Sequence, residues 1–269
     1  MSVAYVVLIA AAVLTLAPIL LSLMTSFKSP HQFAVEPALN PPSPWTLENF
    51  GALFSGQTAD FGHAMLVTAS VVVVVLVGQI VFSIMAAFVF ARLEFPGRDM
   101  LFWAYVGTLM IPPVVTVVPL YLMLSGAGLR DTFWGLVLPY MFGSPYAIFL
   151  LREYFRGVPQ ELVDAARIDG AGTWTVLTRI IVPLSRPIIA TLTVITVVTH
   201  WNNFLWPLII TTSPSLRMIT TATASLQSQY NGNWTLVTAA TTLAIIPLMA
   251  VFVVFNKQIV ASIQITGFR

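Results

Sequence analysis

Long runs of apolar residues, separated by short polar connections, dominate this sequence. A membrane-spanning helix needs about 20 predominantly apolar residues, and six stretches meet that requirement without any Asp, Glu, Lys or Arg. A membrane β-barrel would instead show short strands of alternating polarity. We therefore predict an all-α integral membrane protein, one transmembrane domain over residues 1–269, with six spanning helices at about 3–24, 64–91, 100–123, 132–151, 187–211 and 236–256.

Composition supports a lipid environment for most of the chain. Hydrophobic residues make up 58% of the sequence and charged residues only 8%, which is too few to cover a water-facing surface. The first apolar stretch has neither a basic region before it nor an A-x-A cleavage site after it. We therefore expect it to be a retained span and not a secretory signal.

The basic residues are distributed unevenly between the two sides of the membrane. Six spans place both termini on one side, and that side receives nine of the twelve Lys and Arg residues. The other side holds only Lys28, Arg130 and Arg217. The positive-inside rule therefore predicts that both termini are cytoplasmic.

Prolines and small residues within the spans predict a packed bundle of bent helices. Ser83, Ala87 and Ala91 form a row of small residues at helical spacing, which allows another helix to approach closely. A proline in a lipid-embedded helix persists where neighbouring groups satisfy the freed carbonyls. Each proline is equally consistent with a simple kink; those in question are Pro112, Pro113, Pro119, Pro139, Pro145, Pro207 and Pro247.

The cytoplasmic connection at residues 152–186 is patterned for two short helices. Pro159 and the acidic Glu161 are typical of a first helical turn. Gly170 is typical of a helix end, and a side chain there would be strained if its φ is positive. A second short helix is expected from about residue 173 to 183. The alternative interpretation is an ordinary amphipathic helix on the membrane surface.

The same connection resembles the EAA loop of ATP-binding-cassette (ABC) importer permeases. The string from Glu161 to Ala171, ELVDAARIDGA, has the spacing E-x-x-x-A-A-x-x-D-G-A, and Ile181-Val-Pro183 follows where that family has I-x-L-P. The resemblance implies a coupling helix that sits in a cleft of a separate ATPase. The residues implied to make that contact are Glu161, Ala165, Ala166, Asp169, Gly170 and Ala171.

The resemblance extends over nearly the whole chain to the carbohydrate-uptake branch, of the maltose-transporter G-type. It is carried by Ser26-Phe27-Lys28, by the ARLEFPGR string at residues 91–98 and by Trp201-Asn202. It implies the type I ABC importer permease fold in the bacterial inner membrane. The implied partners are a homologous second permease, two ATPase subunits and an extracytoplasmic solute-binding protein.

Several function classes are excluded by missing motifs. The chain has no G-x-x-x-x-G-K-[ST] phosphate loop, so we expect no ATP hydrolysis by this subunit and no cofactor of its own. In the implied assembly, ATP and Mg²⁺ bind to the partner ATPase. The chain has no cysteine, and its net charge of +2 indicates no nucleic-acid partner.

Polar residues in the fifth predicted span suggest a substrate pathway. Polar groups at this depth face the bundle interior or a water-filled path, and an indole ring can stack on a sugar. The alternative is hydrogen bonding between helices, which stabilises a membrane protein by about 0.6 kcal/mol per pair. The candidates are Thr196, Thr199, His200, Trp201, Asn202, Asn203 and Trp206.

The segment before the last span is a candidate contact with the binding protein. The resemblance implies this role for Gln227, Gln229, Tyr230 and Asn231, and the alternative is a plain exposed turn. His31 and His63 are isolated in the sequence, so we expect no metal site.

Taken together, these patterns indicate the permease subunit of a binding-protein-dependent sugar importer. One rival is a permease of the same architecture for a non-sugar solute such as a glycerophosphate ester or an amino acid. The other is a channel or secondary carrier that works alone. The absence of any charged residue in the spans argues against a proton-coupled carrier.

Overall fold

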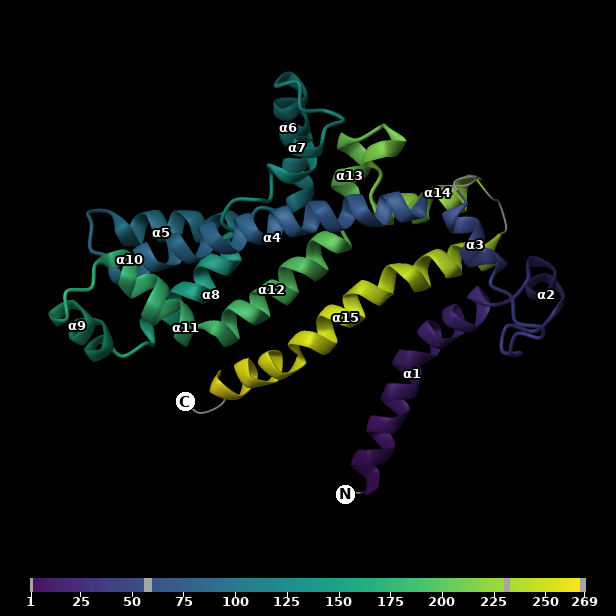
Figure 1. Ribbon diagram of the computed structural model, residues 1–269, viewed down its shortest axis with the longest axis horizontal. Coiled ribbons are helices and arrows are strands. Elements are labelled where there is room, and N and C mark those ends of the chain that lie inside the picture. The colour runs from purple at the N-terminus through teal and green to yellow at the C-terminus, as the bar shows by residue number, and fades with distance from the viewer. Residues whose placement is uncertain (1, 56–59, 230–232, 267–269) are drawn as a thin grey trace. The chain divides into compact units, whose positions relative to one another are not determined.

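The part of the chain that the structure describes is mostly helical. The computed structural model describes residues 2–55, 60–229 and 233–266, with side chains for 4–55, 60–227 and 233–257 (Figure 1). Its helices are α1 Ser2–Ser26, α2 Pro30–Val35, α3 Glu48–Phe54, α4 Phe61–Arg92, α5 Arg98–Gly107, α6 Pro113–Gly126, α7 Phe133–Val137, α8 Pro145–Arg156, α9 Gln160–Ile168, α10 Thr173–Val176, α11 Val182–Leu184, α12 Arg186–Trp201, α13 Leu205–Ile210, α14 Ile219–Gln229 and α15 Trp234–Thr266. Two 3₁₀ helices, Thr108–Met110 and Pro214–Leu216, and the π-helix Leu177–Ile181 complete the set.

Among the described residues, three helices are long and apolar enough to cross a membrane unbroken. They are Ala4–Ser26 within α1, Phe61–Arg92 and Trp234–Lys257 within α15. They correspond to the first, second and sixth predicted spans, which are confirmed as continuous helices. Pro18 in α1 and Pro247 in α15 lie inside these helices without ending them.

The third predicted span is not one straight helix. The segments Arg98–Met110 and Pro113–Gly126 are bent by 101° relative to each other. Ile111 adopts an extended conformation with ψ 116°, as expected for a residue before proline, and Pro112 follows it with ψ 130°. The prolines at 112 and 113 thus end one helix and start the next, which agrees with the predicted bending at prolines, and the span at 100–123 stays a prediction.

The fourth and fifth predicted spans are also interrupted. The fourth, at 132–151, contains only the five-residue α7 and the start of α8, with Pro139 and Gly143 in the irregular stretch between them. The fifth, at 187–211, divides into α12 and α13 around Asn202. If each bent pair is counted as one span, the described residues contain up to five candidate spans, and the predicted total of six stays a prediction. The cytoplasmic placement of both termini stays a prediction.

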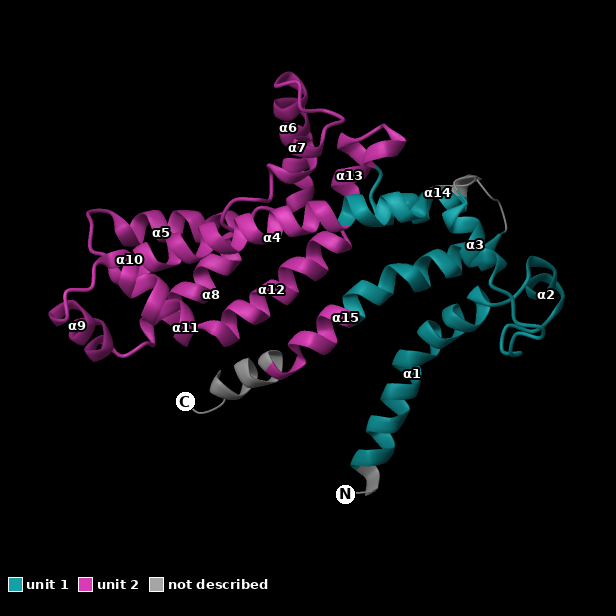
Figure 2. Ribbon diagram, viewed as in Figure 1, with its two compact units in different colours: residues 1–68, 217–249 teal, residues 69–216, 250–269 magenta. Residues whose placement is uncertain are grey.

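The chain forms two compact units, residues 1–68 with 217–249 and residues 69–216 with 250–269 (Figure 2). In the first unit, Asn49 is a buried hydrogen-bonding centre. Its Nδ2 donates to the carbonyls of Ser26 at 2.9 Å and Lys28 at 2.8 Å, and its Oδ1 accepts from the Thr235 hydroxyl at 2.9 Å. Asn49 thereby joins the end of α1 to the beginning of α15.

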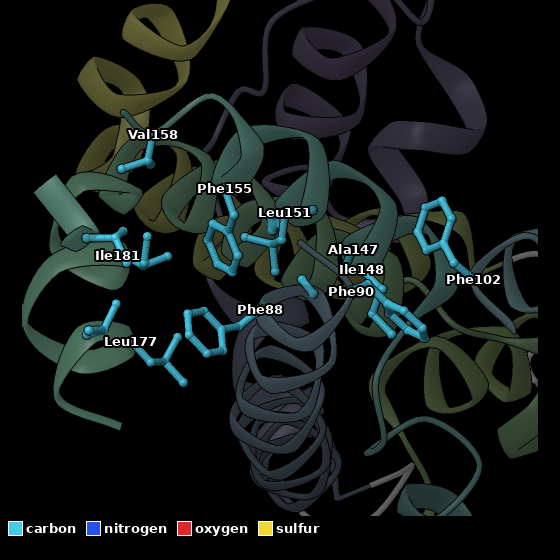
Figure 3. Close-up of a cluster of buried hydrophobic side chains, with 14 residues drawn as sticks. Phe88, Phe90, Phe102, Ala147, Ile148, Leu151, Phe155, Val158, Leu177 and Ile181 are labelled. Atoms are coloured by element: carbon cyan, nitrogen blue, oxygen red, sulfur yellow. The ribbon is translucent and has the colours of Figure 1, made fainter. Parts of the chain in front are cut away.

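The second unit is built around a buried cluster of aromatic and aliphatic side chains (Figure 3). Phe88 of α4 and Phe155 of α8 meet Leu177 of the π-helix in this cluster. Phe102 of α5 joins it and is fully buried. The cluster holds together the helix ends from which the 152–186 connection begins.

Close approach between α4 and the irregular stretch before α8 depends on small residues. Ser83 and Ala87 are fully buried, and the Ser83 hydroxyl accepts a hydrogen bond from the Ser144 N–H at 3.1 Å. One turn earlier, the Cα of Gly78 faces the Met141 carbonyl, and a Cβ there would overlap that oxygen. The small-residue row predicted from sequence is therefore confirmed as a packing surface.

Asp131 organises the turn between α6 and α7. It has a positive φ of 57°, and its carboxylate accepts hydrogen bonds from the N–H groups of Thr212 and Ser213, each at 2.9 Å. The Ser213 hydroxyl donates to the same carboxylate. These bonds hold the pKa of Asp131 well below its ordinary value, and the bond from the Ser213 hydroxyl contributes most to that lowering.

The contact between Gly78 and Met141 predicts that Gly78→Ala destabilises the bundle. The opposing atom belongs to the backbone and cannot rotate away, so overpacking should cost about 1–3 kcal/mol. We expect a lower thermal midpoint in detergent and a lower yield of folded protein. Gly107→Ala is the matched control because a Cβ there meets nothing within 4 Å. Equal midpoints for the two variants would contradict the predicted clash.

The hydrogen bonds to Asp131 predict a pH-dependent contribution to stability. Because the folded-state pKa is depressed, this contribution is present above the ordinary aspartate pKa of about 3.9 and is lost as pH falls further. Asp131→Asn, which tolerates the positive φ, should lower the thermal midpoint at pH 7. The deficit should shrink below about pH 4. Glu94→Gln, at an exposed carboxylate, should show no deficit; a deficit for Asp131→Asn that persists unchanged at low pH would refute this account.

Candidate functional site

The connection between α8 and α12 folds as two short helical segments joined at Gly170. The first, α9, ends in a Schellman motif: the Ala171 N–H donates to the Ala166 carbonyl at 2.9 Å, and the Gly170 N–H donates to the Arg167 carbonyl at 3.0 Å. Gly170 has φ +84°, which confirms that this position needs a glycine. The second segment comprises α10, the π-helix and α11, and it leads into α12 after a bend of 78°.

One face of α9 anchors it to the protein. Val163 is only 2% exposed within the buried cluster, and Ala166 and Ala171 pack against that cluster. These contacts involve small or short side chains, so the helix lies close to the elements beneath it.

The opposite face of α9 is open. Glu161, Ala165 and Asp169 are exposed, as the interpretation of a partner-binding helix requires. Two large apolar side chains that the sequence interpretation did not single out accompany them: Ile168 is 86% exposed and Trp174, on α10, is 64% exposed. Their sequence signal was their spacing. Ile168 lies five positions after the buried Val163, and Trp174 lies two positions before the buried Val176, so neither falls on the buried face of its helix. These two side chains give the connection exposed apolar surface that a protein partner would cover.

The polar residues of the fifth predicted span fall into two groups. In the buried group, the Thr196 hydroxyl donates to Gln79 Oε1 on α4 at 3.0 Å, and Gln79 Nε2 donates to the Tyr140 carbonyl at 3.2 Å. The His200 ring lies 4.9 Å from the Tyr140 ring. The Trp206 indole N–H donates to the Gly135 carbonyl at 3.0 Å. These contacts match the alternative of hydrogen bonding between helices.

The second group is at least partly exposed. Thr199 and Asn202 are exposed, and Asn203 is half-buried with its side chain hydrogen-bonded to Tyr140. Trp201 is 5% exposed, so its ring offers little surface for stacking. The pathway interpretation therefore rests on Thr199, Asn202 and Asn203.

The candidate contact with the binding protein is only partly described. Gln227 is exposed near the end of α14, and Gln229 is the last residue of that helix, with its side chain outside the described set. Tyr230 and Asn231 lie outside the described residues. Among the described residues, no group of three His, Asp or Glu side chains is arranged to hold a metal ion.

Comparison with known proteins places these features in context. A family model described as binding-protein-dependent transport system inner membrane component matches residues 79–265. The diacetylchitobiose uptake system permease protein NgcG of Streptomyces coelicolor is 31% identical over 100% of this chain and 89% of its own length.

Two further relatives have different solutes in their names. The arabinooligosaccharides transport system permease protein AraQ of Halalkalibacterium halodurans is 32% identical over 85% of this chain and 81% of its own. The sn-glycerol-3-phosphate transport system permease protein UgpE of Yersinia enterocolitica is 32% identical over 95% of this chain and 93% of its own length. Among solved structures, a chain of a bacterial ABC transporter for alginate import matches with a TM-score of 0.83 at 21% identity, covering 95% of this chain and 94% of that one.

The hydrogen bond between Thr196 and Gln79 predicts different effects for two neighbouring threonines. Thr196→Val leaves the Gln79 amide oxygen without its donor and should lower stability by about 1 kcal/mol. Thr199→Val, at an exposed position of the same helix, should leave stability unchanged. Thermal unfolding of the two purified variants in the same detergent checks this. A larger loss for Thr199→Val would mean that Thr196 is not the structural partner.

Proposed function

Because this chain belongs to the family of binding-protein-dependent transport system inner membrane components, we propose that it is a permease subunit of an ATP-driven importer of sugars or sugar-like solutes. Family membership rests on the match over residues 79–265 and on relatives aligned along the full chain. The protein is accordingly a multi-pass protein of the bacterial inner membrane.

The observation that carries the proposed mechanism is the geometry of α9. A short helix with a buried anchor, a fixed end at Gly170 and an open face that contains Ile168 is suited to dock against a rigid partner. We propose that this partner is an ABC ATPase and that Glu161, Ala165, Ala166, Asp169, Gly170 and Ala171 form or border the contact. Of these, Ala166 and Ala171 set the height of the helix over the buried cluster.

ATP and Mg²⁺ would bind to that partner, since this chain carries no phosphate loop. The proposed assembly contains a second, homologous permease, two ATPase subunits and an extracytoplasmic binding protein. Closure of the ATPase pair would move α9 as a rigid body, and α9 would shift the spans to which it is connected. The solute delivered by the binding protein would then enter a path that includes Thr199, Asn202 and Asn203.

Sugars are the solute class that the comparisons favour, because the named substrates of two relatives are oligosaccharides. A glycerophosphate ester is the second candidate, because a relative for sn-glycerol-3-phosphate is equally similar. The predicted spans contain no Lys or Arg that could pair with a phosphate, which favours the uncharged solute.

Reconstitution distinguishes these candidates from each other and from a carrier that works alone. The chain is placed in proteoliposomes with the permease, ATPase and binding protein encoded beside it. Uptake of radiolabelled di- or trisaccharide is expected only when ATP is supplied on the side of the membrane that carries the ATPase and when binding protein is present. Uptake driven by a proton gradient without ATP would overturn the proposal, and uptake of glycerol 3-phosphate alone would replace the solute class.

The positive φ of Gly170 predicts that Gly170→Val uncouples the ATPase. A Cβ there meets no atom within 4 Å, so the penalty comes from the backbone conformation alone, and the end of α9 should shift. We expect ATP-driven uptake to fall at least tenfold, with the subunit still inserted in the membrane. Gly172→Val is the matched control, because Gly172 is equally open but has a φ of −72°. Normal uptake and normal ATPase co-purification with Gly170→Val would contradict the docking role.

A further inference from the structure

Arg92, the last residue of α4, reaches across to the junction between α8 and α9. One terminal nitrogen, Nη2, donates to the Phe155 carbonyl and, at 2.5 Å, to the Val158 carbonyl. The other, Nη1, donates to Gln160 Oε1 at 2.7 Å. A single side chain on a spanning helix therefore holds three groups around the point where the connection begins.

The two carbonyls lie where α8 ends and the chain turns through residues 157–159 before α9 starts. The Phe155 carbonyl accepts a hydrogen bond from the Val158 N–H at 3.2 Å, and Arg92 supplies a second donor to it and a donor to the Val158 carbonyl. A cation is also favourable at this end of a helix because of the helix dipole. Arg92 therefore caps the C-terminus of α8.

The contact continues into α9. Gln160, the first residue of that helix, donates from its Nε2 to Asp164 Oδ1 at 2.9 Å, one turn along. Arg92, Gln160 and Asp164 thus form a chain of hydrogen bonds from the end of α4 into the first turn of α9. The position of that first turn is tied to the position of α4.

A second arginine makes the reciprocal contact. Arg152 of α8 is 6% exposed, and its Nε donates to the Phe90 carbonyl in the last turn of α4 at 3.3 Å. Its guanidinium lies 3.9 Å from the centre of the Phe102 ring and also contacts Asp99 at 3.4 Å. Each helix thus carries an arginine that caps the other, and we call Arg92 and Arg152 the reciprocal arginine pair.

We propose that Arg92 is a positioning residue that transmits movement of α9 to α4. This inference rests on the proposed function, because it assumes that α9 is the part that the ATPase moves. Val163 already buries α9 against the core and Val158 buries the turn before it, so the fold of the helix does not depend on Arg92. Arg92 adds direction, because its planar fork fixes the junction through two nitrogens, which a lysine ammonium cannot do.

The absence of cysteine from the chain allows a direct measurement of this role. A nitroxide label is attached to Ile168→Cys, at the exposed end of α9, and its mobility is recorded by electron paramagnetic resonance in the permease without the ATPase. Arg92→Met is expected to increase label mobility, and Arg92→Lys should give an intermediate spectrum. Arg156→Met removes the same charge from an exposed side chain on the neighbouring helix and should leave the spectrum unchanged.

The functional readout uses the unlabelled, assembled transporter. It is the ratio of ATPase activity with solute-loaded binding protein to ATPase activity without it. We expect Arg92→Met to lower this ratio at least fivefold and Arg156→Met to leave it unchanged. Gln160→Ala removes only one exposed partner of Arg92, so it tests the same contact with a partial effect if Arg92→Met does not assemble.

The outcomes separate this inference from the proposed function. A normal spectrum or a normal ratio for both Arg92→Met and Gln160→Ala would overturn the positioning role. Failure of the unmodified chain to associate with any ATPase would instead overturn the proposed function. In that case the label mobility still reports whether Arg92 holds the junction between α8 and α9. The proposal that Arg92 transmits ATPase-driven movement of α9 to α4 would then be refuted.

Discussion

The structure depends on supplying hydrogen-bond donors to carbonyl groups that are freed where helices end. In a membrane, no water is available to satisfy such groups, and each unsatisfied one costs several kcal/mol. Here long side chains from neighbouring elements act as the donors: Arg152 to Phe90 and Trp206 to Gly135. Gln79 serves the Tyr140 carbonyl and the Tyr105 hydroxyl serves that of Gly143. The irregular stretch before α8 is possible because these donors are present.

Sequence patterns predicted the continuous helices well and the interrupted ones poorly. A charge-free run such as that of α4 has no alternative to a helix in lipid, whatever its surroundings. Proline does not have one effect: Pro18 and Pro247 lie inside intact helices, whereas Pro112 begins a new helix direction. The presence of a proline therefore does not decide by itself whether a helix continues, and the local pattern does not show which outcome follows.

The same distinction separates the predictable part of the candidate site from the rest. Gly170 was predictable because a Schellman motif is a local structure, and its spacing to Glu161 is a local pattern. The partner of Thr196 was not, because Gln79 lies 117 positions away in the sequence. Arg92 belonged to a recognised string at residues 91–98, but only the fold shows that it meets Phe155 and Gln160. Long-range pairs of this kind are determined by packing and leave no periodic signal.

The π-helix at Leu177–Ile181 has a consequence for how such a permease can diverge. A π turn accommodates about one residue more than an α turn, so removing a single residue there would restore α geometry. An α turn completes the same revolution with about 3.6 residues, so Trp174 would keep nearly the same direction relative to Ile181. The stretch can therefore lose the extra residue of the π turn while the exposed indole stays on the same side, which lets homologous subunits differ in length here without redirecting it.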